Sequence, residues 1–278
     1  VLAPVAEKAG AALVTLGADG KGTLADAADA ASPDFATVPR QADDLAALLY
    51  TSGTTGRSKG AMLTHGNLVS NTRALQQAWR YSADDVLIHA LPIFHTHGLF
   101  VATNVTLFSG ASMIFLPKFD VDRIFELMGR ATVLMGVPTF YVRLLQDDML
   151  TAENTRHMRL FVSGSAPLLA ETHREWQART GHAILERYGM TETNMNASNP
   201  YDGDRVAGTV GMPLPGVQII VTDPETGAEL PQGEIGMIEV RGPNVFKGYW
   251  QMPEKTAAEL RENGFFITGD LGLSLIHI

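Results

Sequence analysis

Tyr50-Thr-Ser-Gly-Thr-Thr-Gly-Arg-Ser-Lys-Gly60 is the stretch that decides the fold. It follows the apolar run Leu45–Leu49, so the pattern predicts a strand that runs into a loop of hydroxyl groups and bare backbone. Glycines let backbone come close to a ligand, and successive N–H groups in such a loop form a concave anion site. Further donors come from hydroxyl groups and one ammonium group: Thr51, Ser52, Thr54, Thr55, Ser58 and Lys59. The loop therefore suits a polyphosphate.

Two other interpretations of this loop are weaker. The Walker A motif requires Gly-x4-Gly-Lys-[Ser/Thr], but counting from Gly53 places Ser58 where the second glycine must stand. A flexible polar turn between two strands is the simpler alternative. The Lys59-Gly60 pair and the return to apolar residues at Ala61 favour the phosphate site.

Composition limits the classes of partner. The 278 residues can hold one large or two ordinary domains, and 45% hydrophobic residues suffice for a substantial core. A net charge of -9 argues against a nucleic-acid groove or an anionic membrane surface as partner, since both need clustered Lys and Arg. The chain lacks cysteine, which excludes disulfides and thiolate metal sites and is compatible with a reducing cytoplasm. No apolar run approaches the roughly 20 residues of a spanning helix, so we expect a cytoplasmic, soluble protein.

Helices and strands are expected to alternate after the loop. Leu68, Thr72, Leu75 and Trp79 recur at helical spacing, and residues 86–91 read as a buried strand. Further helices are predicted at 99–108, 120–130, 138–148 and 167–179, and further strands at 111–116, 132–136, 159–163 and 183–187. This alternation predicts an α/β fold with a doubly wound, largely parallel sheet. Ligands in such sheets lie at the carboxyl ends of strands, where the motifs begin.

The segments on either side of this α/β pattern differ from it in composition and in predicted secondary structure. Residues 1–16 predict a helix followed by a strand at 11–16, and residues 17–41 a loop or weak surface helix. Beyond Pro200, short strands at 217–222 and 235–240, joined by a turn at Asp223, predict a smaller β-rich subdomain. We therefore expect an α/β part at 1–200, a β-rich subdomain at 201–272 and an anomalous apolar tail at 273–278. Neither end resembles a natural terminus, so we expect a fragment.

Five motifs follow one another along the chain: YTSGTTGRSKG at 50–60, LPIFHTHG at 91–98, YGMTET at 188–193, GEIGMIEVRGPNVFKGYW at 233–250 and TGD at 268–270. Together they resemble the acyl-adenylate-forming superfamily of acyl-CoA synthetases, nonribosomal adenylation domains and luciferases. Their surroundings, such as GVPTFYVRLL and SGSAPLL, are most similar to malonyl-CoA synthetases. The resemblance implies an ATP-dependent acid:CoA ligase that forms malonyl-CoA or methylmalonyl-CoA through an acyl-adenylate. ATP, Mg²⁺, CoA and a dicarboxylic acid are then its ligands.

For the nucleotide, the resemblance implies that Glu192 binds Mg²⁺ and that Asp270 holds the ribose hydroxyls. Mg²⁺ prefers one or two carboxylates together with phosphate oxygens, and hydroxyls form charge-assisted bonds to a carboxylate. A helix-start Glu192 and a turn-capping Asp270 are the structural alternatives. The implied nucleotide-binding residues are Thr51, Ser52, Gly53, Thr54, Thr55, Gly56, Lys59, Glu186, Arg187, Tyr188, Gly189, Thr191 and Asp270, and the implied catalytic residues are Thr55, Lys59, His95 and Glu192.

For the acid, the resemblance implies that Arg143 grips the carboxylate that does not react, with a planar fork that lysine lacks. A solvated arginine on the helix face is the alternative for Arg143. His95 is expected to orient the substrate, whereas His97 is expected to be a satisfied structural histidine. A zinc site at this His-x-His pair is disfavoured because no Cys or third His lies nearby. Ser163, Gly164 and Met190 are the remaining residues expected in the acyl pocket.

The chain departs from the family pattern after Gly272, where LSLIHI replaces the expected hinge and small mobile domain. We therefore expect an incomplete domain that lacks the mobile C-terminal domain and turns over poorly. Two alternatives stay open: a ligase or adenylation domain for a fatty or aryl acid, and a nucleotide-binding fragment without turnover.

Overall fold

The structure, a computed structural model, describes residues 2–51 and 58–275. The chain divides into two compact units, Val1–Arg40 and Gln41–Ile278. The first contains α1 (Ala3–Ala9) and α2 (Thr23–Asp29), neither of which buries a residue. The strand predicted at 11–16 is wrong: these residues are exposed, and no strand among the described residues pairs with them. A strand needs a paired strand for its backbone donors and acceptors, whereas the backbone of Thr15 bonds to Thr23 and Leu24 at the start of α2.

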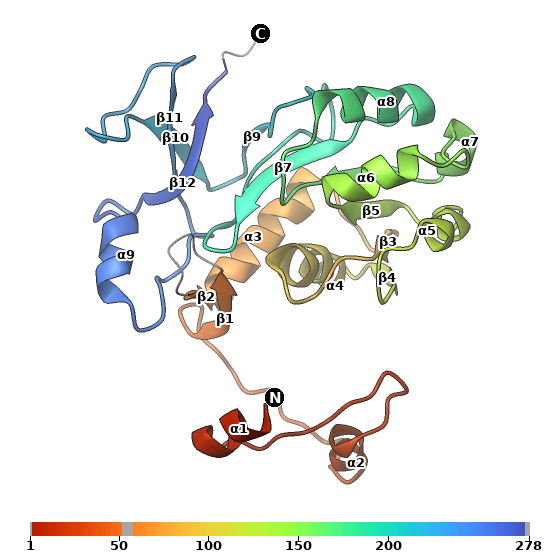
Figure 1. The fold of residues 1–278 in the computed structure, drawn as a ribbon, viewed down its shortest axis with the longest axis vertical. Coiled ribbons are helices and arrows are strands. Elements are labelled where there is room, and N and C mark those ends of the chain that lie inside the picture. Colours follow the sequence, from red (N-terminus) through yellow and green to blue (C-terminus); the bar gives the residue numbers. More distant parts are fainter. Residues whose placement is uncertain (1, 52–57, 276–278) are drawn as a thin grey trace. The chain divides into compact units, whose positions relative to one another are not determined.

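A mostly parallel sheet organises the second unit (Figure 1). Its strands are β3 (Val86–His89), β4 (Ser112–Phe115), β5 (Val133–Gly136), β6 (Leu160–Ser163), β7 (Leu185–Met190), β8 (Asn194–Ser198) and β9 (Met212–Pro213). Within the described ranges the sheet has seven strands in the order β4-β3-β5-β6-β7-β8-β9. Pairing is parallel from β4 to β7 and antiparallel from β7 to β9. The predicted α/β fold with a largely parallel sheet is confirmed.

Helices pack on both faces of this sheet. They are α3 (His65–Ala78), a π-helical turn (His97–Thr103), α4 (Asn104–Phe108), α5 (Val121–Met128), α6 (Pro138–Leu145), α7 (Ala152–Thr155) and α8 (Ala170–Thr180). Alternate strand residues point to opposite faces: Val133 and Met135 pack with residues of α3 and α4, whereas Leu134 packs with residues of α5, α6 and α8. Burial on both faces is why these strands read as short apolar runs.

Side chains at the helix starts fix where the helices begin. Thr64 accepts from the Asn67 backbone N–H while Asn67 accepts from that of Thr64, a capping box at the start of α3. Asp120 caps α5 in the same manner through the N–H of Arg123. Pro138 occupies the first turn of α6, where its missing N–H is no loss.

Two smaller antiparallel sheets complete the second unit. One pairs β1 (Leu45–Thr51) with β2 (Lys59–Thr64) on either side of the glycine-rich loop. The other has the order β10 (Gln218–Thr222), β11 (Ile235–Arg241) and β12 (Phe266–Leu273), with α9 (Pro253–Glu259) between β11 and β12 in sequence. The two strands predicted for the β-rich part are confirmed, and the subdomain boundary near residue 200 stays a prediction.

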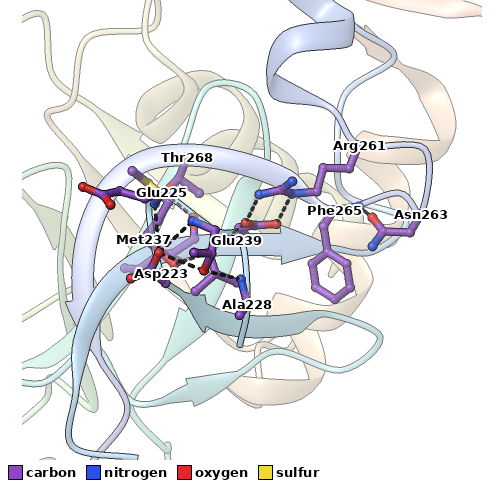
Figure 2. Close-up of polar contacts among 12 residues, drawn as sticks. Asp223, Glu225, Ala228, Met237, Glu239, Arg261, Asn263, Phe265 and Thr268 are labelled. Carbon is purple, nitrogen blue, oxygen red and sulfur yellow. Dashed lines mark hydrogen bonds and ion pairs between the residues drawn. The ribbon is translucent and has the colours of Figure 1, made fainter. Parts of the chain in front are cut away.

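The β-rich sheet contains an ion pair between the buried Glu239 and the exposed Arg261 (Figure 2). Glu239 accepts from Arg261 Nε at 2.7 Å and Nη2 at 2.6 Å, and from the Thr222 hydroxyl at 2.8 Å. Nearby, the Asp223 carboxylate accepts from the backbone N–H groups of Glu225 and Thr226, which forms the predicted turn. These bonds stabilise the segment that leads into β12.

The Thr268-Gly-Asp motif lies inside β12 rather than after a strand, which corrects one prediction. The reason is that β12 continues to pair with β11 beyond the motif, through Leu271 and Gly272. The pairing shifts register at this point, and Gly269 adopts a φ of 81°. Of the helices in the described ranges, none combines the length and the apolar character needed to cross a bilayer.

Candidate active site

A cavity of about 510 Å³ lies at the carboxyl ends of four parallel strands. Its walls come from the loop after β3, from Val137 after β5, from Ser165 after β6, and from Arg187 and Gly189–Glu192 on β7 and the following turn. This is the edge of an α/β sheet at which ligands bind. The motifs predicted to meet at strand ends therefore supply most of one cavity.

Arg187 is the buried charge of this cavity. Its side chain is on β7, and only 3% of the residue is exposed. In the part of the chain that the structure describes, Arg187 has no ion-pair partner, its Nε has no acceptor, and the nearest bonded group is Ser165 Oγ at 3.5 Å. Burial lowers the pKa of Arg187 to about 10, so the guanidinium keeps its charge at neutral pH. A buried charge without a counter-ion is costly, and an anionic ligand would supply the missing partner.

Residues 164 and 165 shape the space around Arg187. A Cβ added to Gly164 would lie 2.4 Å from Arg187 Cζ, so only glycine leaves room for the guanidinium in this position. Ser165 has a φ of 69°, which is uncommon for a residue with a side chain and is often found at functional sites. Its hydroxyl lies 3.3 Å from His97 Nδ1 and 3.5 Å from Arg187 Nη2.

His97 lines the cavity, which differs from its predicted role as a satisfied structural histidine. The ring is buried, and among the described residues its Nε2 has no hydrogen-bond partner. Burial and the positive charge of Arg187 hold the pKa of His97 well below its usual range, so the ring is neutral at pH 7. Sequence spacing could not reveal this, because the relevant neighbours, Ser165 and Arg187, are distant in the chain. His95 is exposed at the rim, with its ring centroid 4.6 Å from that of Phe94.

Glu192 lies in the turn between β7 and β8, not at a helix start, and lines the same cavity. It is 4% exposed, and burial raises the pKa of its carboxyl group. The described residues contain no group of three or more His, Cys, Asp or Glu side chains that would hold a metal alone. Mg²⁺ bound with a nucleotide needs only one or two carboxylates, because phosphate oxygens and water complete its shell. Glu192 at the cavity wall fits that requirement.

Lys59, the first residue of β2, converges with Glu192 on one hydroxyl group. The Tyr249 hydroxyl lies 3.3 Å from Lys59 Nζ and 2.9 Å from Glu192 Oε1. Lys59 Nζ also lies 3.7 Å from Glu259 Oε2 and 4.6 Å from the centroid of the Tyr249 ring. Thr51, opposite Lys59 in the β1–β2 pair, has a buried hydroxyl without a partner in the described ranges. The end of the glycine-rich loop and the predicted metal ligand are thus brought together.

Ser52, Gly53, Thr54, Thr55 and Gly56 lie outside the described residues. Their predicted contacts with phosphate remain predictions.

Other predicted nucleotide residues are also near one another. The Tyr188 hydroxyl on β7 donates to Asp270 Oδ2 on β12 at 2.6 Å, which joins two of the predicted motifs. Gly189 is forced to be small, because a Cβ there would lie 2.0 Å from the backbone oxygen of Asn194. Glu186 is buried away from the cavity lining; its Oε1 accepts from the Leu168 N–H, and burial raises its pKa.

Three residues predicted for the acid, Arg143, Ser163 and Gly164, do not line the cavity. Arg143 on α6 is exposed, with its guanidinium carbon 4.6 Å from the centroid of the Phe119 ring. Ser163, at the end of β6, is buried, and its Oγ has no partner among the described residues. Met190, predicted for the acid, and Thr191, predicted for the nucleotide, both line the cavity. The residues that sequence reasoning missed are Ser165, Tyr249 and Glu259; Tyr249 lay within a quoted motif but carried no sign of its role.

Comparison with known proteins gives a consistent picture. The profile of the AMP-binding enzyme family matches residues 3–250. A malonate–CoA ligase of Arabidopsis thaliana is 42% identical over 250 residues, which cover 83% of this chain and 40% of the relative. The crystal structure of ATP-bound MatB from Rhodopseudomonas palustris is 73% identical with a TM-score of 0.96, covering 98% of this chain and 54% of that one.

A malonyl-CoA ligase in a ternary product complex with methylmalonyl-CoA and AMP is 38% identical with a TM-score of 0.85, covering 99% of this chain and 61% of that one. The chain spans about half the length of the relatives it matches. Because the family profile covers most of the chain, this chain belongs to the AMP-binding enzyme family.

Proposed function

We propose that this chain has the function of an AMP-forming acid:CoA ligase, which converts malonate or methylmalonate to its CoA thioester. The observation that carries the proposal is Arg187, a buried guanidinium that has no counter-ion among the described residues and lies in the cavity that Glu192 also lines. A diacid has one carboxylate to react and one to neutralise such a charge. The relatives named malonate–CoA ligase and the methylmalonyl-CoA complex support the same class of acid.

The proposed reaction has two steps. In the first, one carboxylate oxygen of the acid attacks the α-phosphorus of ATP, and the bond to pyrophosphate breaks. In the second, the CoA sulfur attacks the acyl carbon, AMP leaves, and the thiol proton is released. A carboxylate is already ionised at pH 7 and needs no general base. Positioning and stabilisation of charge are therefore the main tasks of the protein.

We assign those tasks to the residues around the cavity. Lys59 would neutralise phosphate charge, and Glu192 would hold Mg²⁺, which when bound neutralises charge on the phosphate oxygens. Tyr188 and Asp270, already in contact at 2.6 Å, would bind the nucleoside. His95 at the rim would orient the reacting carboxylate.

Arg187 would bind the second carboxylate of the acid, with help from Ser165 and His97. The neutral His97 ring has a free Nε2 in the described structure, and Ser165 touches both neighbours. Arg143 remains a second candidate for this clamp. A cytoplasmic location, with which a chain that lacks cysteine is compatible, also remains a prediction.

The two arginines can be separated by substitution. Arg187→Met is expected to lower malonate-dependent ATP–pyrophosphate exchange by roughly 10⁴-fold, the lower end of the range by which polar sites reject ligands without the matching group. Exchange with butyrate, which has no second carboxylate, should change by less than about tenfold. Arg143→Ala is the matched control and should leave the malonate-to-butyrate ratio near its original value.

Three results would redirect the proposal. Loss of the malonate preference in Arg143→Ala but not in Arg187→Met would move the clamp to α6. A parent protein that prefers a fatty or aryl acid would contradict the assignment of a diacid substrate. Binding of ATP by the parent protein without exchange for any acid would leave only a nucleotide-binding role.

A further inference from the structure

The segment Asn244–Trp250 holds the turn that carries Glu192. The Phe246 N–H donates to the Glu192 backbone oxygen at 2.8 Å, and Asn244 Nδ2 donates to the Thr193 oxygen at 2.6 Å. These bonds reach both Glu192 and its neighbour in the β7–β8 turn. The backbone position of the predicted metal ligand therefore depends on a segment about fifty residues later in the sequence.

The same segment pairs with β2, which begins at Lys59. The Lys247 N–H donates to the Met62 oxygen and the Met62 N–H to the Gly248 oxygen, both at 2.9 Å. The Trp250 N–H donates to the Gly60 oxygen at 2.8 Å. Asn244–Trp250 thus bridges two elements that carry the charged groups expected to meet a nucleotide.

Tyr249 lies at the centre of this bridge. Its hydroxyl oxygen is 3.3 Å from Lys59 Nζ, 2.9 Å from Glu192 Oε1 and 2.8 Å from Glu259 Oε2. The ring is buried and packs edge-on against Phe246, with centroids 4.8 Å apart. The hydroxyl has a single hydrogen to donate and can accept from an ammonium group. Among the described residues, the Tyr249 hydroxyl is therefore the group that contacts the Glu192 carboxylate, the Glu259 carboxylate and the Lys59 ammonium group.

Glu259, on α9, fixes Tyr249 from the other side. Its Oε1 pairs with Lys255 Nζ at 2.6 Å, while its Oε2 faces the Tyr249 hydroxyl and lies 3.7 Å from Lys59 Nζ. Hydrogen bonds to charged groups are shorter and stronger than neutral ones. Glu259 can thereby hold both the hydroxyl and the ammonium group in place.

We propose that Tyr249 is a positioning residue that, held by Glu259, fixes the Glu192 carboxylate and the Lys59 ammonium group relative to each other. Its effect is to make the site prefer ATP with Mg²⁺ over ATP alone. The inference rests on the proposed function, since it takes the ligand to be a nucleotide triphosphate with a divalent cation. Tyr249 needs no contact with that ligand.

Calorimetry on this chain tests the idea without any measurement of turnover. The quantity of interest is the ratio of the ATP dissociation constants measured with EDTA and with excess Mg²⁺. Tyr249→Phe keeps the ring and its packing but removes the hydroxyl, and should lower this ratio about tenfold, the size expected for one hydrogen bond to a charged group. AMP, which lacks the β- and γ-phosphates, should bind within about twofold of the original affinity.

Tyr81→Phe is the matched control. Its hydroxyl is also buried and also bonded, to the Thr106 hydroxyl at 3.2 Å, but it lies outside the site. This variant should leave the ratio unchanged even where it lowers stability. Glu259→Gln should lower the ratio by less than Tyr249→Phe, because the amide keeps an acceptor oxygen. The double variant should be no worse than Tyr249→Phe alone, since the two residues act in one chain of contacts.

The outcomes separate the inference from the proposed function. An unchanged ratio in Tyr249→Phe, or an equal loss of AMP affinity, overturns the positioning role while the ligase assignment stands. A lowered ratio in this chain, together with no acid-dependent exchange by the full-length parent protein, supports the positioning role and removes the ligase assignment.

Discussion

The two ends of the parallel sheet differ in whether a buried charge has partners within the described structure. At the amino ends, Asp85 before β3 accepts from Arg159 Nε and Nη2, both at 2.6 Å, and from the Thr132 hydroxyl at 2.7 Å. At the carboxyl ends, the one hydrogen bond of the Arg187 side chain among the described residues is a 3.5 Å contact with a serine hydroxyl. Both charges are almost fully buried, but the protein itself satisfies only the first.

The difference separates stability from function. A buried charge with a complete set of partners fixes local structure, and removal of one partner is strongly destabilising. A buried charge without partners lowers stability, and it persists where a ligand supplies what is missing. Glu239 with Arg261 in the β-rich sheet belongs to the first kind (Figure 2).

The largest expected effect on stability comes from Asp85→Asn. The change removes the counter-ion of Arg159 and should lower the free energy of unfolding by roughly 3 to 5 kcal/mol, as for other buried pairs that lose one partner. Urea denaturation would measure this. A loss below about 1 kcal/mol, typical of an exposed ion pair, would remove the distinction between the two ends.

Arg187→Met should shift stability in the other direction. Replacing an unpaired buried guanidinium with an apolar side chain of similar length removes a desolvation cost, and we expect a gain of about 1 to 2 kcal/mol in the absence of ligand. Thermal unfolding of both variants side by side gives the comparison directly. A destabilised Arg187→Met would mean that the protein itself satisfies this charge.

The smallest effect concerns pH and His97. Its pKa is held well below 6.5 in the folded protein, whereas the unfolded chain takes up the proton near pH 6.5. The contribution of His97 to stability is therefore complete above about pH 6.5 and is lost as the pH falls, by at most about 1.4 kcal/mol per pH unit. His97→Gln should give a shallower fall in the free energy of unfolding between pH 6.5 and 5; parallel curves would contradict this.

Much of the fold could be predicted because the central strands are buried on both faces. In such a strand consecutive residues are all apolar, as in Val133–Met135. An uninterrupted apolar run of this kind is easy to recognise between helical segments. Strand β8, with the sequence NMNAS, is absent from the sequence prediction because several of its buried residues are polar. Asn71 bonds the backbone of Met195 in both directions, so a buried strand has no apolar pattern to detect.

The site was predictable only in part. Glu192 and Lys59 follow from motifs, and the structure brings them to one hydroxyl. Tyr249 is 190 residues from Lys59, and its role depends on convergence in space rather than on spacing. The motif around Arg187 predicts a contact with the nucleotide, and the sequence does not show whether the charge has a partner within the protein.

If Arg187 binds the second carboxylate as proposed, Gly164 gives the protein a simple evolutionary route to other acids. Any larger residue at that position would force the head of Arg187 aside, and the flexible end of an arginine can move without disturbing the fold. Every ionisable group of the chain would remain, yet the pocket would no longer present its positive charge. A change in one codon for an uncharged residue can therefore alter substrate choice as much as the loss of the arginine itself.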